Sequence, residues 1–320
     1  MQLTVFSPRK RVPKQNERAE HDCTMSDRLP TAATLFEKLP RFLRRHALMK
    51  WWMRLTGESP LQLVRVRDNH FGYADMSDGF LRLIVIDQGF EEDFFAIADR
   101  IFAKGGTFLD CGANHGLLSF GLAGRHDGSI DFHLFEPNRK LIDSIEMTRK
   151  LYPGIRMTLN QAAISDREGT VCFELVEHQT GTSHISNNGA GIEVPSLTLD
   201  GYITRTGIEW VDLLKLDVEG YELPALRGAQ RALTERIIRA VYFEYFEKWL
   251  VRVGPPSELI AFLDSVGFVT CFCRTCDFET MGAPTHELAE AGIPLLPVTG
   301  QTLPSMTDLM AVPLERLVAL

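Results

Sequence analysis

The 320-residue sequence has no apolar run long enough to cross a bilayer. A membrane-spanning helix needs about 20 consecutive apolar residues, and polar or charged residues interrupt every apolar stretch well before that length. No apolar segment follows the basic N-terminus as it would in a secretory signal. The six cysteines are scattered, unlike those of small secreted domains held by disulfides. We therefore expect a reduced, cytoplasmic protein.

Positive charge is also in short supply. Lys and Arg number 34 against 42 Asp and Glu, a formal net charge of −8, whereas nucleic-acid-binding proteins carry basic surfaces. No nucleic-acid partner is expected. The first 60 residues differ, because they hold 12 of the basic residues and only 6 acidic ones. Residues 1–30 are polar and basic without hydrophobic periodicity, which predicts a disordered leader.

The most informative stretch is a strand, a glycine turn and a helix start at 107–120. Its apolar run ends in Asp110, and Gly112, Asn114 and Gly116 follow in a turn of small residues. Glycine tolerates positive φ and lets the backbone approach a ligand closely, while a helix start offers free N–H groups. The pattern predicts the first β-turn-α element of a Rossmann-like sheet, with a nucleotide-like ligand at its mouth.

A second apolar strand, 130–135, ends in Glu136, whose carboxylate can accept hydrogen bonds from both hydroxyls of a ribose. A dinucleotide site would have glycine at the position of Asn114, to admit a pyrophosphate. S-adenosylmethionine (SAM) has no phosphate. Its ammonium suits Asp110, and its carboxylate suits the amides of the turn. The pattern favours SAM as the cofactor.

A further strand ends in acids at 212–219, and at this point the sequence resembles the FkbM family of SAM-dependent methyltransferases. The resembling stretches are FLDCGANHG at 108–116, LFEPN at 134–138, SLTLD at 196–200, LLKLDVEGYEL at 213–223 and LRGA at 226–229. They cover about residues 106–268. Cys111 and His115 stand where the family commonly has aliphatic or small residues, and neither removes a group that the cofactor needs.

The expected fold is α/β, a Rossmann-like class I methyltransferase with a mostly parallel seven-stranded sheet flanked by helices. Strands at 107–110, 130–135 and 155–160 alternate with helices, which predicts parallel pairing. An antiparallel pair, 268–272 with 308–312, is expected to close the sheet, and 279–305 reads as a loop-rich insertion. The methyltransferase domain is expected to span 105–320.

Residues 31–104 are expected to form a small N-terminal extension with a basic amphipathic helix at about 35–55 and a β meander at 61–86. The helix has two interpretations. It can lie on the inner, anionic face of a membrane, or it can dock on the catalytic domain or on a second subunit of a homo-oligomer. Docking is favoured, because Pro40 interrupts the helix.

The resemblance also implies site residues beyond the glycine turn. Asn138 follows the second strand, and Gln161 and Ala162 follow the third, where related enzymes line the adenine. Asp217 and Glu219 lie at a strand end beside the cofactor, so we expect either to orient a hydroxyl or to accept its proton. Asp217 can instead serve as a helix cap.

Two further features bear on the chemistry. The polar, glycine-rich segment 178–191 is predicted to be a mobile loop over the site, and its His184 is a further catalytic candidate. Glu244, at the next strand end, joins Asp217 and Glu219 as a third acid. Three acids can hold Mg²⁺, but the sequence does not require it. No metal is predicted at Cys271-x-Cys273-x-x-Cys276 either, since no histidine completes a set.

The resemblance implies O-methylation of a hydroxyl on a sugar, glycolipid or polyketide-like natural product. An N-methyltransferase acting on protein or nucleic acid is the alternative, although no Asn/Asp-Pro-Pro-Tyr/Phe motif follows the fourth strand. A non-catalytic SAM-binding or membrane-associated scaffold is a third hypothesis. The complete set of turn residues and Glu136 disfavours it.

Overall fold

The structure is a computed structural model that describes part of the chain. The described residues are 46–57, 59–68, 70–79, 81, 90–126, 128–273 and 281–320. The predicted leader, the first part of the predicted basic helix and Cys276 therefore lie outside the described residues. Within them, no helix has the length and apolar character needed to cross a membrane.

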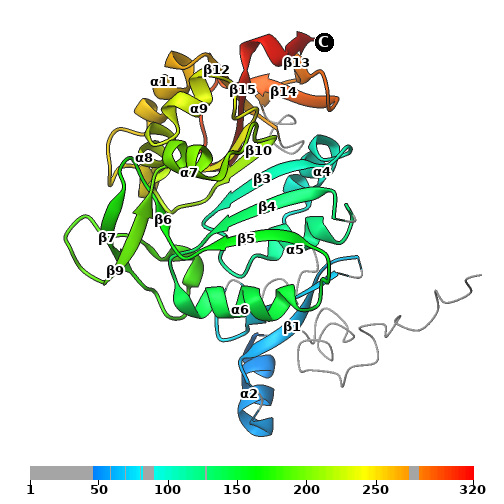
Figure 1. The fold of residues 1–320 in the computed structure, drawn as a ribbon, viewed down its shortest axis with the longest axis vertical. Coiled ribbons are helices and arrows are strands. Elements are labelled where there is room, and N and C mark those ends of the chain that lie inside the picture. The colour runs from blue at the N-terminus through cyan, green and yellow to red at the C-terminus, as the bar shows by residue number, and fades with distance from the viewer. Residues whose placement is uncertain are drawn as a thin grey trace, which may run out of the picture.

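A mixed sheet of ten strands forms the centre of the described residues (Figure 1). Five neighbouring strands are parallel, in the order β11-β10-β3-β4-β5. They are β3 (Gly106–Cys111), β4 (Ile130–Phe135), β5 (Arg156–Asn160), β10 (Leu213–Leu216) and β11 (Val241–Phe246). The remaining pairings are antiparallel, in the order β11-β15-β12-β14-β13-β16. These strands are β12 (Phe268–Phe272), β13 (His286–Leu288), β14 (Ile293–Pro297), β15 (Met306–Pro313) and β16 (Leu317–Ala319).

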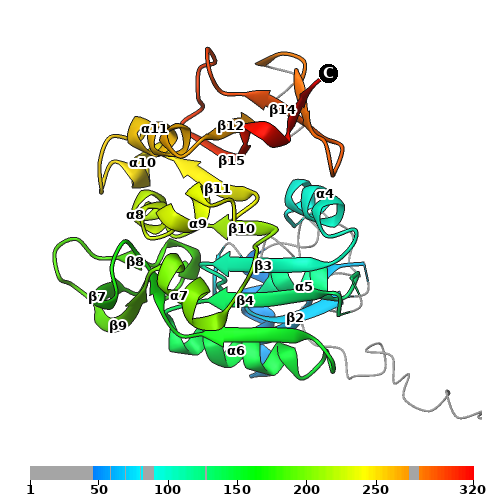
Figure 2. The same ribbon diagram turned by 45° about the horizontal axis from the view of Figure 1, so that its top comes forward.

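The structure confirms part of the predicted sheet and corrects the rest. The parallel strands from 107 to 160 and the antiparallel pair β12–β15 are confirmed. A mostly parallel sheet of seven strands is wrong. The predicted loop-rich segment 279–305 instead contributes β13 and β14, and β16 adds a further strand. Short connections suffice for antiparallel pairing, so these strands lengthen the sheet at the end opposite to β5 (Figures 1 and 2).

Helices cover both faces of the sheet, and successive strand residues feed two separate cores. Phe108 of β3 belongs to the core packed by α4 (Glu92–Ile101), α5 (Leu117–Ala123) and α6 (Arg139–Arg149). Leu109, its neighbour, belongs to the other core. That core is packed by α7 (Leu199–Thr206), α8 (Glu222–Arg227), α9 (Gln230–Thr234) and α11 (Ser257–Ser265). This alternation explains why the inner parallel strands β4, β10 and β11 are mostly apolar, whereas the edge strand β5 is not.

Two smaller β elements flank the central sheet. The first is a four-stranded sheet in the order β6-β9-β7-β8, which lies to the left of β3 and β4 in both views (Figures 1 and 2). Its strands are β6 (Ala163–Ile164), β7 (Gly169–Glu174), β8 (His184–Ile185) and β9 (Ile192–Leu197). The second is the antiparallel hairpin of β1 (Leu61–Arg67) and β2 (His70–Asp75). It supplies two strands of the predicted meander, whose last part lies mostly outside the described residues.

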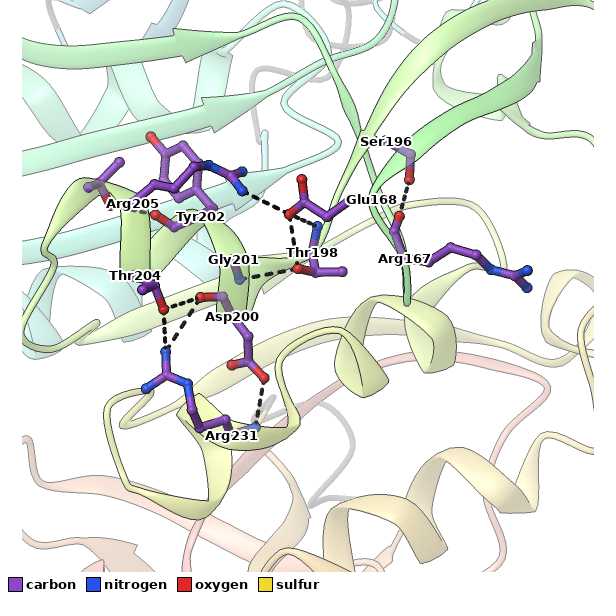
Figure 3. A network of polar contacts seen from close by, with 11 residues as sticks. Arg167, Glu168, Ser196, Thr198, Asp200, Gly201, Tyr202, Thr204, Arg205 and Arg231 are labelled. Carbon is purple, nitrogen blue, oxygen red and sulfur yellow. Dashed lines mark hydrogen bonds and ion pairs between the residues drawn. The ribbon is translucent and has the colours of Figure 1, made fainter.

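The SLTLD segment holds helices in place, as Figure 3 shows. Thr198 caps α7 by accepting a hydrogen bond from a backbone N–H of its first turn. Asp200 accepts from two backbone N–H groups at the start of α9, one of them that of Arg231. Glu168 accepts from Thr198 and forms an ion pair of 3.0 Å with Arg205. This part of the family resemblance therefore has a structural role.

Candidate active site

The turn between β3 and α5 brings two strand ends into close contact. Gly112 and Gly116 have positive φ, 75° and 69°. A Cβ on Gly112 would lie 1.9 Å from the carbonyl oxygen of Asp217, so only glycine fits there. A Cβ on Gly116 would press on Phe120 at 3.1 Å. Two cavities, a small pocket and a large cleft, adjoin this turn. Gly112 lines both of them, whereas Gly116 lines neither and serves as the N-cap of α5.

A small pocket of about 50 Å³ lies beside this turn. Gly112, Asn114 and Glu136 form its polar side with Asp217 and Glu219. Its apolar walls are Phe135, Pro137, Ala162, Ala163, Ile164, Phe173, Ile185 and Val218, and Thr180, Gly181 and Ser183 complete it. An apolar slot with carboxylates along one side suits an adenosine group, because the base is flat and apolar and the ribose donates hydrogen bonds.

Glu136 lines the small pocket from the end of β4. Its side chain is buried, and its two oxygens accept hydrogen bonds from the backbone N–H groups of Asn114 (2.9 Å) and Asn138 (2.8 Å). Burial raises the pKa of Glu136 to about 7 despite these bonds. A carboxylate has about four acceptor positions, so Glu136 can still accept from ribose hydroxyls.

Three predicted cofactor residues have a different place in the structure. Ala162 lines the small pocket, but Gln161 is exposed, with its side-chain oxygen 3.5 Å from a guanidinium nitrogen of Arg139. The side chain of Asn138 caps α6 by accepting from the backbone N–H of Lys140. Asn138, Gln161 and Gly116 therefore line neither cavity.

Asp110, the fourth exception, is fully buried beneath the turn. Its Oδ2 accepts from the hydroxyl of Ser119 (2.8 Å), and its Oδ1 lies 3.3 Å from Nζ of Lys215. Lys215 also lies 3.3 Å from Asp217 Oδ2 and donates to the carbonyl of Gly112. Asp110 lines neither cavity, and its ion pair with Lys215 supports the turn. Its contact with the ammonium of SAM stays a prediction.

Lys215 lines the large cleft of the site and was missed by the sequence reasoning. Burial alone would lower its pKa, but the carboxylates of Asp217 and Asp110 outweigh that effect and raise the pKa above its ordinary value. Lys215 therefore stays charged and links the ends of β3 and β10. Its sequence signal was a single basic residue inside an otherwise apolar strand, LLKL.

A large cleft of about 990 Å³ adjoins the small pocket. The two cavities share Gly112, Asn114, Gly181, Asp217 and Glu219. The cleft has the size of a site for a small molecule or a short glycan. It therefore provides the space for a second substrate next to a bound cofactor.

Three acids meet where the two cavities join. Asp217, Glu219 and Glu244 each place a carboxylate oxygen within 4.8 Å of the others, which makes them the group among the described residues that could hold a metal ion. Burial, together with the charges of Asp217 and Glu244, raises the pKa of Glu219 far above the ordinary carboxylate value. Burial and the charge of Asp217 also raise the pKa of Glu244. Glu219 and Glu244 therefore retain protons near neutral pH.

Glu219 has a strained backbone that a neighbour stabilises. Its φ is 54°, in the left-handed region that few non-glycine residues adopt. The buried side chain of Glu222 accepts hydrogen bonds from the N–H groups of Val218 (3.1 Å) and Gly220 (3.3 Å), on either side of Glu219. Such strain persists where the surroundings enforce it and is common at active sites.

His184 does not join the acids. It lines neither cavity, its Nδ1 lies 3.0 Å from the carbonyl of Thr182, and its ring packs 5.8 Å from that of Trp249. The segment 178–191 does contribute Thr180 and Gly181 to the lining of the small pocket. It includes β8, which pairs with β7, and its mobility stays a prediction.

An aromatic wall of the cleft was also missed. Phe246, at the end of β11, and Trp249, in α10 (Glu247–Leu250), line it with ring centroids 5.9 Å apart. The guanidinium of Arg252 lies 3.6 Å from the centroid of the Trp249 ring. The aromatic run FEYFEKW was the available signal.

Residues 110–270, just over half of the chain, match the family model described as the methyltransferase FkbM domain. The chain belongs to the FkbM family of methyltransferases. It is a SAM-dependent methyltransferase, and SAM is its cofactor. The residues present fit this group: Glu136 and the apolar walls of the small pocket would hold the adenosine, and bound SAM supplies an electrophilic methyl group.

Individual relatives are distant. The 2-O-methyltransferase NoeI of Sinorhizobium fredii is 26% identical over 167 residues, which is 46% of this chain and 67% of that protein. An FkbM methyltransferase structure from Methylobacillus flagellatus has a TM-score of 0.38 at 14% identity, over 65% of this chain and 43% of that one. The SAM-bound magnesium protoporphyrin IX methyltransferase of Synechocystis has a TM-score of 0.37 at 14% identity, over 88% and 97% of the two chains. The family assignment rests on the domain match.

Proposed function

We propose that this FkbM methyltransferase methylates a hydroxyl group of a sugar, glycolipid or polyketide-like natural product. One observation carries the proposal. Asp217 and Glu219 line both the small pocket and the large cleft, and Glu244 adds a third carboxylate within 4.8 Å. A hydroxyl in the cleft would thus meet proton acceptors at the border with the cofactor.

The residues of the junction suit the proton transfer that O-methylation requires. Bound SAM would supply the methyl group, and the hydroxyl that receives it must lose its proton to a group of the protein. An ordinary carboxylate is a weak base toward an alcohol, but Glu219, whose pKa burial raises, is a stronger one. We assign Glu219 as the proton acceptor and Asp217, held by Lys215, as the group that orients the hydroxyl.

The cleft walls favour a glycan-like acceptor. Phe246 and Trp249 offer an aromatic surface to the apolar face of a sugar ring, while the acids accept hydrogen bonds from its hydroxyls. The name of the relative from S. fredii, a 2-O-methyltransferase, also supports transfer to oxygen.

The test is methyl transfer by the full chain to a panel of methyl glycosides, glycolipids and amines, followed by S-adenosylhomocysteine (SAH) release and mass spectrometry. Glu219→Gln should lower kcat about 10²–10⁴-fold, as loss of a general base does, with little change in SAH affinity. Glu209→Gln, at an exposed site outside both cavities, is the matched control. Transfer to the amines alone would contradict the proposal.

A further inference from the structure

The turn after the β1–β2 hairpin contacts the roof of the small pocket. Asp78 is 1% exposed, and its Oδ2 accepts hydrogen bonds from the backbone N–H (2.6 Å) and the hydroxyl (3.0 Å) of Thr180. The next residue, Gly79, donates its N–H to the carbonyl of His178. Three bonds thus tie this turn to the segment 178–180.

Thr180 connects that segment to the cofactor turn. It lines the small pocket together with Gly181, and its Oγ1 lies 3.4 Å from Oδ1 of Asn114. The hydroxyl has one proton, and Asp78 is the nearer acceptor. The backbone N–H of Thr180 is directed to Asp78 as well. Asp78 therefore sets the position of the residues that close the pocket.

The hairpin that carries Asp78 is fixed to the catalytic domain. The N–H of Tyr73 donates to Thr148 Oγ1 (2.9 Å), and the hydroxyl of Tyr152 bonds both the N–H and the carbonyl of Phe71. The N–H of Asp75 donates to Nε2 of His115 at 3.4 Å. These contacts anchor the hairpin on α6 and on the cofactor turn, so it provides a rigid support.

We propose that Asp78 is a positioning residue for SAM, which holds Thr180 and Gly181 over the adenosine end of the site. It lies outside the matched family domain, which begins at residue 110. Hydrogen bonds to a buried carboxylate are strong, and without it the N–H of Thr180 would be left unpaired at a pocket wall. The N-terminal hairpin is therefore a part of the cofactor site.

Calorimetric titration of the full chain with SAH tests this without any acceptor. Asp78→Ala should weaken SAH binding about tenfold or more, and Thr180→Val, which keeps the N–H, by a smaller factor of about two to five. In the double variant the second substitution should add little, because both remove the same hydroxyl bond. Asp78→Asn, which keeps one acceptor oxygen, should restore part of the affinity.

Asp75→Ala is the matched control, since its carboxylate accepts from Ser77 in the same turn. SAH affinity unchanged in Asp78→Ala, or reduced equally in Asp75→Ala, would overturn the proposal. If Asp78→Ala does not fold, Thr180→Val decides alone: full affinity there overturns the proposal.

A separate observation concerns α2 (His46–Thr56), which extends from the body of the molecule below β1 (Figure 1). Leu48, Trp51 and Leu55 are 42%, 58% and 66% exposed, and their spacing of three and four puts them on one face. The helix has no acidic residue, and it carries Lys50 and Arg54. Three arginines precede it at 41, 44 and 45.

We infer that α2 binds an anionic lipid surface. Its exposed apolar face would enter the headgroup region, and the basic residues of this part of the sequence would be attracted to anionic lipid. The docking interpretation accounts for Met53, which is buried in the core, and not for the three exposed residues.

Flotation of the full chain with phosphatidylcholine vesicles, with and without phosphatidylglycerol, tests this inference. We expect binding only to the anionic vesicles, and Trp51→Ser with Leu55→Ser should remove it. Leu314→Ser, at a residue 63% exposed elsewhere, is the control and should bind normally. Equal flotation of all variants would overturn the inference. If light scattering shows that the α2 variant has half the mass of the wild type, the inference is also overturned, and the exposed face of α2 binds a second copy of the chain instead.

Discussion

The small pocket and the large cleft share five residues, yet their carboxylates are held in opposite ways. In the small pocket Glu136 meets two backbone N–H groups, so its position is set by the strand ends. At the junction with the cleft, Glu219 and Glu244 face other carboxylates, and Asp217 has the Lys215 ammonium. The first arrangement fixes a carboxylate for ligand recognition, and the second raises the pKa of Glu219 and Glu244, so that each is a stronger base once it is charged. Binding and proton transfer are thus assigned to neighbouring acids in different surroundings.

The largest effect is expected at Lys215, which contacts both the cofactor turn and the acids of the junction. Lys215→Met leaves the buried carboxylate of Asp110 without its cation and removes the partner of Asp217. Breaking a buried ion pair costs about 3–5 kcal/mol, so the free energy of unfolding in urea should fall by about that amount. Lys104→Met, at an exposed site, should have almost no effect. A loss below about 1 kcal/mol in Lys215→Met would mean that Asp110 is stabilised in another way.

The next largest effect is the pH dependence of turnover. Glu219 must be charged to accept a proton, and burial with neighbouring acids raises its pKa. The value of kcat/KM should therefore rise with pH, up to tenfold per unit, well above the usual carboxylate range, and level off beyond the raised pKa. Glu244→Gln removes one neighbouring negative charge, so the rise should move to lower pH. A wild-type profile that is flat from about pH 5 upward would contradict this role.

A weaker pH effect is expected on cofactor binding. Glu136, whose pKa is about 7, accepts ribose hydrogen bonds best when charged. SAH affinity measured by calorimetry should therefore fall below pH 7, by up to about tenfold per unit. The folded state holds this proton more tightly than the unfolded chain, whose value is 4.5, so the unliganded protein should lose stability as pH rises through that interval. Glu136→Gln should bind weakly at every pH. An affinity that stays constant down to about pH 5 would exclude Glu136 as the ribose acceptor.

The sequence could predict those features of the fold and the site that depend on local patterns. The parallel strands, the glycine turn and Glu136 follow from local periodicity and from the rule that ligands bind at the carboxyl ends of strands. The junction of Asp217 and Glu219 was predictable for the same reason. The partners of Asp110 and the capping role of Asn138 could not be predicted, because they depend on which groups the folded chain brings next to these side chains. Asp78 reaches Thr180 across 102 residues, a distance over which no local pattern carries information. Strands β13 and β14 were hidden by the prolines and glycines around them.

The smallest effect is expected at the two residues after β5, and it separates a position in the motif from a position in the pocket. Gln161→Ala should leave SAH affinity unchanged within about twofold, because its side chain is exposed and directed to Arg139. Ala162→Leu should weaken SAH binding, since the added atoms would enter a pocket of about 50 Å³. Both variants should melt within a few degrees of the wild type, as judged by circular dichroism. Weaker binding by Gln161→Ala alone would mean that this side chain turns inward when SAM binds, so that the family resemblance, and not the unliganded geometry, describes the adenine contact.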